Sequence, residues 1–347
     1  MADNVTIVQQ LLTTDINVII YLGFTIFLFV IGAVGNGLIV LAMIVEKKLW
    51  VPGCAFTINL AVSDLGVLFL SDLFIIIGIA TDGEMFLQNI TFCKISSYLC
   101  LALCVVSIWN IAIGSIHSYV RVCHRLNYHK IFRHYSWLLA CVLTWLIGLL
   151  LLSPTLLGWG GHSYDNVLRY CTFDFQQSPS YNYVLLALGI VLPMTLASYS
   201  FLRILCDVLT SRRRLQRIEP ARDGGKTLMP PLINTFMIQA GIKTQLAQPD
   251  CINASDARMI RSFLMVFIYL LSAWLFLIAI WFTMGAKDWS PVQITVAMTF
   301  AHSHCSVNGF LYAVTNKHLR NTLVKILQCG RRKRKISMSN LQAVDDL

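Results

Sequence analysis

The chain has 347 residues, of which 56% are hydrophobic and only 13% are charged. Soluble domains usually carry about a quarter charged residues, so this composition excludes an ordinary soluble protein and indicates a chain solvated by lipid. The formal net charge of +10 does not require a nucleic-acid partner, because the basic residues gather on one side of the expected membrane.

Seven long apolar runs follow one another along the chain. Each is at least as long as the roughly 20 residues that a helix needs to cross the hydrocarbon core. Backbone groups in lipid must be paired within the segment, so the runs predict helices, and no short alternating strands typical of a barrel occur. We therefore expect an all-α membrane protein, a seven-transmembrane helix bundle. Its spans lie near Val18–Val45, Cys54–Ala80, Ile95–Val122, Tyr135–Trp159, Tyr181–Leu205, Ser262–Ala286 and Trp289–Val314.

The basic residues predict the orientation of the bundle. With the N-terminus outside the cell, all but three of the 27 Lys and Arg residues fall on the cytoplasmic side, the exceptions being Lys94, Arg169 and Lys287. Because Lys and Arg are enriched in cytoplasmic loops, we expect a multi-pass plasma-membrane protein with an extracellular N-terminus. The sequons at Asn4 and Asn89 both fall outside in this arrangement and are candidate glycosylation sites.

Four segments make up the expected organisation. Residues 1–17 form a short polar extracellular segment, and residues 18–315 form the bundle, in which residues 206–257 are a long third inner loop. Residues 316–329 have an apolar face and basic flanks, which predicts a short amphipathic eighth helix on the membrane surface. Cys329 ends this helix and is a candidate for palmitoylation, with an unmodified thiol as the alternative. Residues 330–347 form a basic tail suited to anionic membrane lipid.

Cysteine and histidine placement bears on disulfides and metals. Of the eleven cysteines, most lie within spans or on the cytoplasmic side, where thiols stay reduced. Only Cys93 and Cys171 lie on the outer side, which favours a disulfide between them. His302 and His304 are two residues apart and lie on different helix faces, which argues against paired metal ligation. No Cys/His spacing resembles a zinc site and no nucleophile has a paired base, so we expect no metal, no cofactor and no enzymatic activity.

Asp64 is an acidic residue in the middle of the second span. A charge in the membrane interior is costly and is typical of a functional site. Asn36, Ser107 and Asn308 lie at a similar depth on the first, third and seventh helices. Two interpretations stay open: a site for a sodium ion or a proton, and a structural carboxylate hydrogen-bonded to Asn36 and Asn308.

A set of marker residues occurs in the expected helices in order: Gly35-Asn36, Leu60-Ala61 with Asp64, Cys93, Trp145, Cys171, Pro193, Trp274 and Asn308 to Tyr312. Together these residues resemble the rhodopsin-like (class A) G-protein-coupled receptors over roughly residues 21–329. The segments at residues 118–124, 153–160 and 170–173 further resemble the melatonin-receptor-like group, without carrying melatonin over as a ligand. The resemblance implies a receptor that passes an extracellular signal to heterotrimeric G proteins and arrestin.

The signalling switch of that family is altered at the inner end of the third helix. His117, Ser118 and Tyr119 stand where the family has an acidic residue, Arg and Tyr. In the family, the arginine forms an ion pair with an acidic residue of the sixth helix. Asp256 is the candidate for that acidic partner, but Ser118 carries no charge and cannot form the pair. Arg121, one turn further on, is interpreted as an ordinary cytoplasmic cation rather than a replacement.

Further departures affect the fifth, sixth and seventh helices. Phe276 and Gly309 replace prolines that kink the family's helices, and Phe201 replaces a tyrosine, whereas Tyr312 is retained. These changes support an alternative function, an atypical receptor-like protein with weak or absent G-protein coupling. A transporter or channel is a third hypothesis, which the lack of internal repeats disfavours.

Two positions exclude known ligand classes. Cys100 occupies the place of the acidic residue with which the family's amine receptors bind cations, and His302 occupies that of the opsin retinal lysine. Trp274 of the sixth helix is interpreted first as a packing residue and second as a candidate for the lining of the same expected pocket. We therefore expect a small neutral or lipid-like extracellular ligand. A docked peptide is the second hypothesis, with contacts at Asp165, Arg169 or Asp174.

Overall fold

The computed structural model describes residues 2–46, 50, 52–133, 135–218, 254–283, 290–315, 320–322 and 324–325. Cys329, the basic tail and most of the expected eighth helix lie outside the described residues. The backbones at Asn4 and Asp256 are described as helical, while their side chains lie outside the described set.

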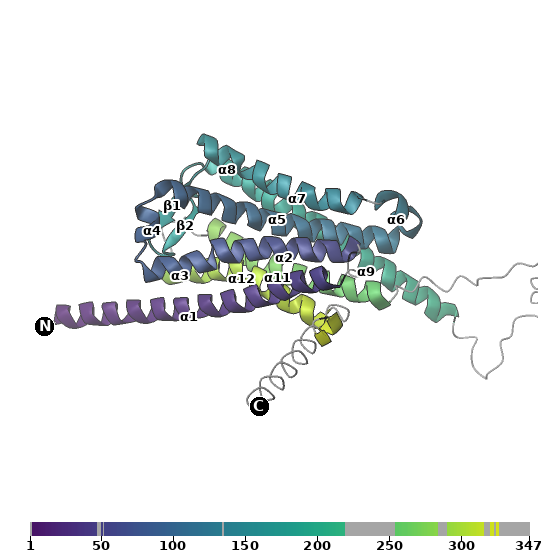
Figure 1. The fold of residues 1–347 in the computed structure, drawn as a ribbon, viewed down its shortest axis with the longest axis horizontal. Helices are drawn as coiled ribbons and strands as arrows, with labels where there is room; N and C mark the ends of the chain where they lie inside the picture. Colours follow the sequence, from purple (N-terminus) through teal and green to yellow (C-terminus); the bar gives the residue numbers. More distant parts are fainter. Residues whose placement is uncertain are drawn as a thin grey trace, which may run out of the picture.

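Seven helical columns run side by side and confirm the expected bundle (Figure 1). In chain order they are α1 (Ala2–Val45); α2 (Pro52–Leu70) with α3 (Asp72–Ala80); α5 (Ile90–Cys123); α7 (Ser136–Leu152) with η2 (Ser153–Leu157); α8 (Pro179–Val184) with η3 (Leu185–Val191) and α9 (Leu192–Ile218); α11 (Ala254–Thr283); and α12 (Pro291–Thr315). Helix α1 begins at Ala2, so its backbone is helical through most of the segment expected to be a polar N-terminus.

Short elements mark the two ends of the bundle. One end carries α4 (Glu84–Leu87) and an antiparallel pair of strands, β1 (His162–Asp165) and β2 (Tyr170–Phe173), in which His162 lies opposite Phe173. We call it the hairpin end. The opposite end carries α6 (Arg125–Ile131) and is called the α6 end (Figure 1).

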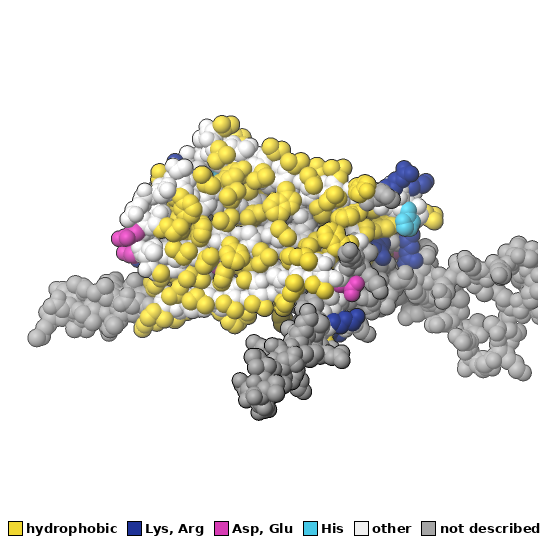
Figure 2. Space-filling view, in the orientation of Figure 1, with side chains coloured by type: hydrophobic (Ala, Val, Ile, Leu, Met, Phe, Trp, Pro, Cys, Tyr) yellow, Lys and Arg dark blue, Asp and Glu magenta, His cyan; other side chains and the backbone are white. Residues whose placement is uncertain are grey.

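An apolar outer surface covers the columns between these ends. Figure 2 shows hydrophobic side chains along the length of the bundle and charged side chains at its two ends. Among the described residues, six helical segments are long and apolar enough to cross a membrane. Helix α12 is not one of them, because it carries the polar residues His302, Ser303, His304, Ser306 and Asn308. All five are buried inside the bundle rather than exposed to lipid.

Two columns deviate from regular α-helix at identifiable positions. The second column breaks at Ser71, between α2 and α3. The fifth column contains a π-helical stretch, η3, directly before Pro193. A proline removes one backbone donor and crowds the preceding turn, and a widened turn relieves that crowding. By contrast α11 and α12 are each continuous, in keeping with the absence of proline at Phe276 and Gly309.

A close approach of α1 and α12 depends on glycine. A Cβ atom on Gly309 would lie 2.8 Å from the backbone nitrogen of Asn36 and 2.8 Å from the carbonyl carbon of Gly35. Asn36 also donates a 2.8 Å hydrogen bond to the Cys305 carbonyl across the same contact. Gly309 therefore does more than replace a kink-forming proline, because it lets two backbones touch.

We expect Gly309→Ala to lower the thermal stability of the purified protein, at a cost of about 1–3 kcal/mol, because the methyl group meets backbone that cannot rotate away. Thermal unfolding in detergent measures the effect. Gly37→Ala, on α1 with nothing near its Cβ position, is the matched control and should keep or slightly raise the stability, because alanine favours a helix over glycine. Equal unfolding temperatures for both variants would contradict this account of the contact.

Candidate functional site

A cavity lies between the helices near the hairpin end, with about 60 Å³ of space that water can reach. That volume holds a few water molecules in this conformation. Its walls come from α5, β2, η3, α11 and α12, and they are mainly aliphatic and aromatic. None of the lining residues that the structure describes is Asp, Glu, Lys or Arg. The lining includes Cys100, Cys104, Tyr170, Trp274, Met298 and His302.

The three pocket residues predicted from the sequence, Cys100, Trp274 and His302, all line this cavity. Cys104 and Tyr170 also line it and were not predicted. Cys104 lies one helical turn after Cys100 and shares its face, a spacing visible in the sequence. Tyr170 precedes the disulfide cysteine, and its ring lies 6.5 Å from that of His302.

Strand β2 covers the cavity and is tied to α5 by a disulfide. The predicted bond between Cys93 and Cys171 is confirmed, and both cysteines are buried. Cys171 lies within β2, so the bond positions Tyr170, Cys171, Thr172 and Phe173 along the cavity wall. The β-hairpin therefore forms part of the site.

The charged residues considered for peptide docking already have partners at the hairpin end. Asp165 accepts hydrogen bonds from the backbone nitrogens of Val167 and Leu168, at 2.8 and 2.9 Å. Arg169 forms an ion pair with Asp82. Asp174 accepts from the backbone nitrogen of Gln176 at 2.9 Å. These contacts weaken the peptide hypothesis, because the same groups stabilise turns.

His162 fastens the start of the hairpin to the bundle and was not predicted. One ring nitrogen, Nδ1, lies 2.8 Å from Ser97 Oγ on α5, and the other lies 3.1 Å from Thr155 Oγ1. The side chain is only 6% exposed. Burial, helped by the charge of Lys94, lowers the pKa of His162 to about 4, so the docked hairpin holds a neutral imidazole.

This shift predicts a hairpin that loosens in acid. A freed His162 regains an ordinary pKa near 6.5, so the opened state binds more protons between about pH 6.5 and 4. The free energy needed to open the hairpin away from the bundle therefore has its full value above about pH 6.5. It falls as the pH drops toward 4 and changes no further below that pH. We expect the rate of amide exchange in β1, corrected for its intrinsic rate, to rise by up to about tenfold for each pH unit by which the pH is lowered between 6.5 and 4. His162→Gln should remove that dependence, and an identical slope in the variant would argue against His162.

The central polar network surrounds Asp64. Its Oδ1 accepts a 2.6 Å hydrogen bond from Ser107 Oγ, and its Oδ2 accepts a 2.8 Å bond from Asn308 Nδ2. Asn36, expected as a direct partner, donates instead to the backbone carbonyls of Gly32 and Cys305. The carboxylate thus joins α2, α5 and α12.

At the α6 end, the altered switch residues form local contacts. His117 is fully buried, with Nε2 2.9 Å from Tyr128 Oη of α6 and its ring packed edge-on against Phe132 at 4.7 Å. Ser118 is also fully buried and donates to the Gly114 carbonyl of its own helix at 2.9 Å. The hydroxyl is thereby used within α5.

Neighbouring residues at this end follow the same pattern. The Arg121 guanidinium lies over the Tyr128 ring, 5.6 Å from its centre, and Tyr119 Oη lies 2.9 Å from His124 Nε2. Tyr312 packs edge-on against Phe263 of α11, with ring centres 5.6 Å apart. Arg121 thus contacts α6, Tyr119 contacts the end of its own helix, and Tyr312 joins α12 to α11.

The expected glycosylation site at Asn89 lies on the surface of the hairpin end. Its side chain is exposed, and its Oδ1 caps α5 by accepting from the Phe92 backbone nitrogen at 3.0 Å. Exposure leaves the amide open to modification, which remains a prediction.

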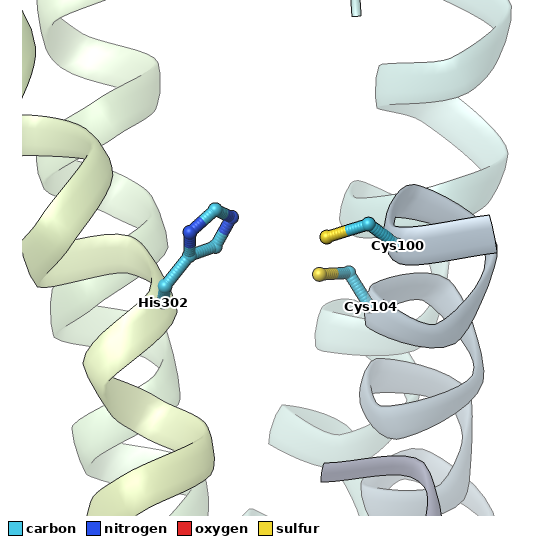
Figure 3. A group of neighbouring side chains, drawn as sticks. All are labelled: Cys100, Cys104 and His302. Atoms are coloured by element: carbon cyan, nitrogen blue, oxygen red, sulfur yellow. The ribbon is translucent and has the colours of Figure 1, made fainter. Parts of the chain in front are cut away.

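The structure brings together groups that the sequence keeps apart. Cys100, Cys104 and His302 offer ligand atoms that all lie within 4.8 Å of one another (Figure 3). Asp64, His304 and Cys305 form a second such group. The expectation of no metal site rested on spacing along the chain, whereas both groups arise from packing between helices.

Both the sequence and the structure are similar to those of known proteins. Residues 35–312 match the model of the 7 transmembrane receptor (rhodopsin family), which covers most of the chain. The crystal structure of squid rhodopsin superposes with a TM-score of 0.70, covering 90% of this chain and 83% of that one at 20% sequence identity. At that identity the likeness concerns the fold.

Melatonin receptors are among the curated relatives. The human melatonin receptor type 1B is 25% identical over 86% of this chain and 75% of its own length. The mouse melatonin receptor type 1A is 31% identical over 55% of this chain and 53% of its own length. The predicted likeness to the melatonin-receptor group is confirmed at this level.

Proposed function

This chain belongs to the rhodopsin family of seven-transmembrane receptors, and on that premise we propose that it binds an extracellular ligand and signals to heterotrimeric G proteins. The observation that carries the proposal is the family match over residues 35–312, which include the cavity and both ends of the bundle. In this proposal the hairpin end faces outside at the plasma membrane, and the α6 end meets the G protein and arrestin.

A small neutral or lipid-like molecule suits the cavity best. Its described lining carries no Asp, Glu, Lys or Arg side chain, so a charged ligand would lose its hydration without gaining a partner. The relatives are named for melatonin, itself a small neutral molecule, which makes melatonin the first compound to test. Trp274 and His302 supply an aromatic surface and a hydrogen-bonding group.

The test is G-protein activation measured in cells across the main Gα classes, with and without melatonin and a panel of neutral lipid-like compounds. We expect at least one compound to raise activity, and Trp274→Ala to weaken its potency by tenfold or more. Leu275→Ala, an exposed residue next to it on α11, is the matched control and should leave potency unchanged. A compound with equal potency on both variants would show that its binding site is not this cavity.

A second candidate function rests on Ser118. A serine carries no charge, so this position supplies no cation for an ion pair with α11 or for a G protein. Its hydroxyl instead donates a hydrogen bond within α5. A receptor that binds ligand yet couples weakly follows from that geometry. Ser118→Arg should then raise G-protein activation while Ser118→Ala leaves it unchanged. Strong activation by the unmodified chain would exclude this second function.

A further inference from the structure

Two thiols and an imidazole face one another across the cavity. Cys100 and Cys104 are one turn apart on α5, so their sulfurs lie on the same face of that helix. Figure 3 shows the His302 ring extending from α12 toward both sulfurs. The ligand atoms of the three residues lie within 4.8 Å of one another, and all three side chains are buried.

A second contact orients the imidazole. Ser71 Oγ lies 2.7 Å from His302 Nδ1, and Ser71 occupies the break between α2 and α3. This contact leaves Nε2 as the ring nitrogen on the side of the sulfurs (Figure 3). Histidines that bind metals almost always donate their other ring N–H to an acceptor, which fixes the tautomer and the ring direction. The Ser71 hydroxyl fills that role when Nδ1 carries the proton and donates to Oγ.

The ligand set and its surroundings select the metal. Two thiolates and one imidazole are soft or borderline ligands, which disfavours Mg²⁺ and Ca²⁺. The described lining of the cavity has no Asp, Glu, Lys or Arg to balance a net charge. Zn²⁺ with two thiolates and a neutral imidazole is electrically neutral, whereas Cu⁺ with the same ligands leaves one negative charge in an apolar site. Neutrality favours zinc.

We propose that Cys100, Cys104 and His302 form a Zn²⁺ site inside the cavity, with the fourth coordination position open to it. Zinc bond lengths of about 2.3 Å to sulfur and 2.0 Å to nitrogen place tetrahedral ligand atoms roughly 3.5–3.8 Å apart. Side-chain adjustments of about 1 Å therefore close the site. Two S–Zn bonds and one N–Zn bond form, the two thiol protons pass to solvent, and no group is oxidised or reduced.

Such an ion would have a structural and a chemical consequence. It would join α5 to α12 across the cavity in which the proposed function places the ligand. Three protein ligands leave a position for water or for an oxygen or nitrogen atom of a bound molecule. The inference goes beyond the proposed function, because metal binding is measured without any ligand or G protein.

The experiment uses the full-length receptor, purified in nanodiscs under reducing conditions and titrated with Co²⁺ as a spectroscopic substitute for Zn²⁺. We expect one Co²⁺ per chain, with thiolate charge-transfer bands and the visible bands of a tetrahedral ion, both displaced by Zn²⁺. Cys104→Ser and His302→Ala should abolish the tetrahedral spectrum. Ser71→Ala should weaken Zn²⁺ binding about 10–100-fold, as loss of an orienting partner does.

Matched controls locate the site. Cys305→Ser removes a buried thiol from the group around Asp64, and Cys141→Ser removes one from α7; both should bind Co²⁺ like the parent chain. Thermal unfolding of every variant without metal checks that each is folded, and His302→Gln replaces His302→Ala if the latter is not.

Three results would overturn the proposal. The first is a parent chain that gives no thiolate-to-cobalt bands. The second is binding lost in Cys305→Ser but kept in Cys104→Ser. The third is a disulfide between Cys100 and Cys104, detected as resistance of both thiols to alkylation before reduction.

Discussion

Removing the disulfide by Cys93→Ala with Cys171→Ala is expected to lower the unfolding temperature of the receptor more than any other change to the hairpin end. The bond joins cysteines 78 residues apart, and closing a loop of that length stabilises a fold by about 4.5 kcal/mol in the chain-entropy model. It also holds β2 against the cavity. Loss of the bond should therefore release the cavity wall as well as destabilise the bundle.

The measurement is thermal unfolding of detergent-purified receptor, together with the amount that reaches the cell surface. Cys206→Ala removes an exposed free cysteine and serves as the control for loss of a thiol as such. Amide exchange should increase in β2 and at the start of α5, while the α6 end stays protected. An unchanged unfolding temperature in the double variant would show that packing alone holds the hairpin.

Features that depend on local composition were predictable from the sequence. The spans were predictable from the apolar runs, because backbone groups in lipid must be paired within helices or closed barrels. The sequence has no alternating strands for a barrel, so helices remained. The disulfide followed from there being only two cysteines on the outer side. Cys100 and His302 were pocket candidates because the resemblance assigns ligand contacts to their positions, and Trp274 because it is an aromatic residue of the sixth helix that can line a cavity.

Features that depend on how helices rotate against one another were not predictable. Cys104 meets His302 only because α5 and α12 turn those faces toward the same cavity, and spacing within either helix says nothing about that. For the same reason, the sequence predicted only one of the two roles of Gly309, the replacement of a kink-forming proline. A missing proline is visible in the sequence, whereas a backbone contact with Gly35 is visible only in the packed bundle.

Asp64→Ala is expected to be the most disruptive single substitution among the buried polar residues. The carboxylate is fully buried and accepts hydrogen bonds from Ser107 and Asn308. Its removal leaves the Asn308 amide without this acceptor, whereas the Ser107 hydroxyl still has Ser63 Oγ at 2.9 Å. Each buried unpaired group costs about 1–3 kcal/mol. The double variant Asp64→Ala with Asn308→Ala should recover part of the loss, because the stranded amide donor is then gone. Asp82→Ala, an exposed carboxylate paired with Arg169, is the control and should cost little.

The same variants separate the two interpretations of Asp64. If the site binds sodium, NaCl raises the unfolding temperature of the parent chain above that in KCl at equal ionic strength, by the free energy of ligand binding to the folded state. Asp64→Ala then loses that difference. If the carboxylate is structural, the two salts give equal temperatures for the parent chain while Asp64→Ala remains destabilised. A parent chain and an Asp64→Ala variant that unfold at the same temperature in both salts would contradict both interpretations, because each requires the carboxylate to join α2, α5 and α12.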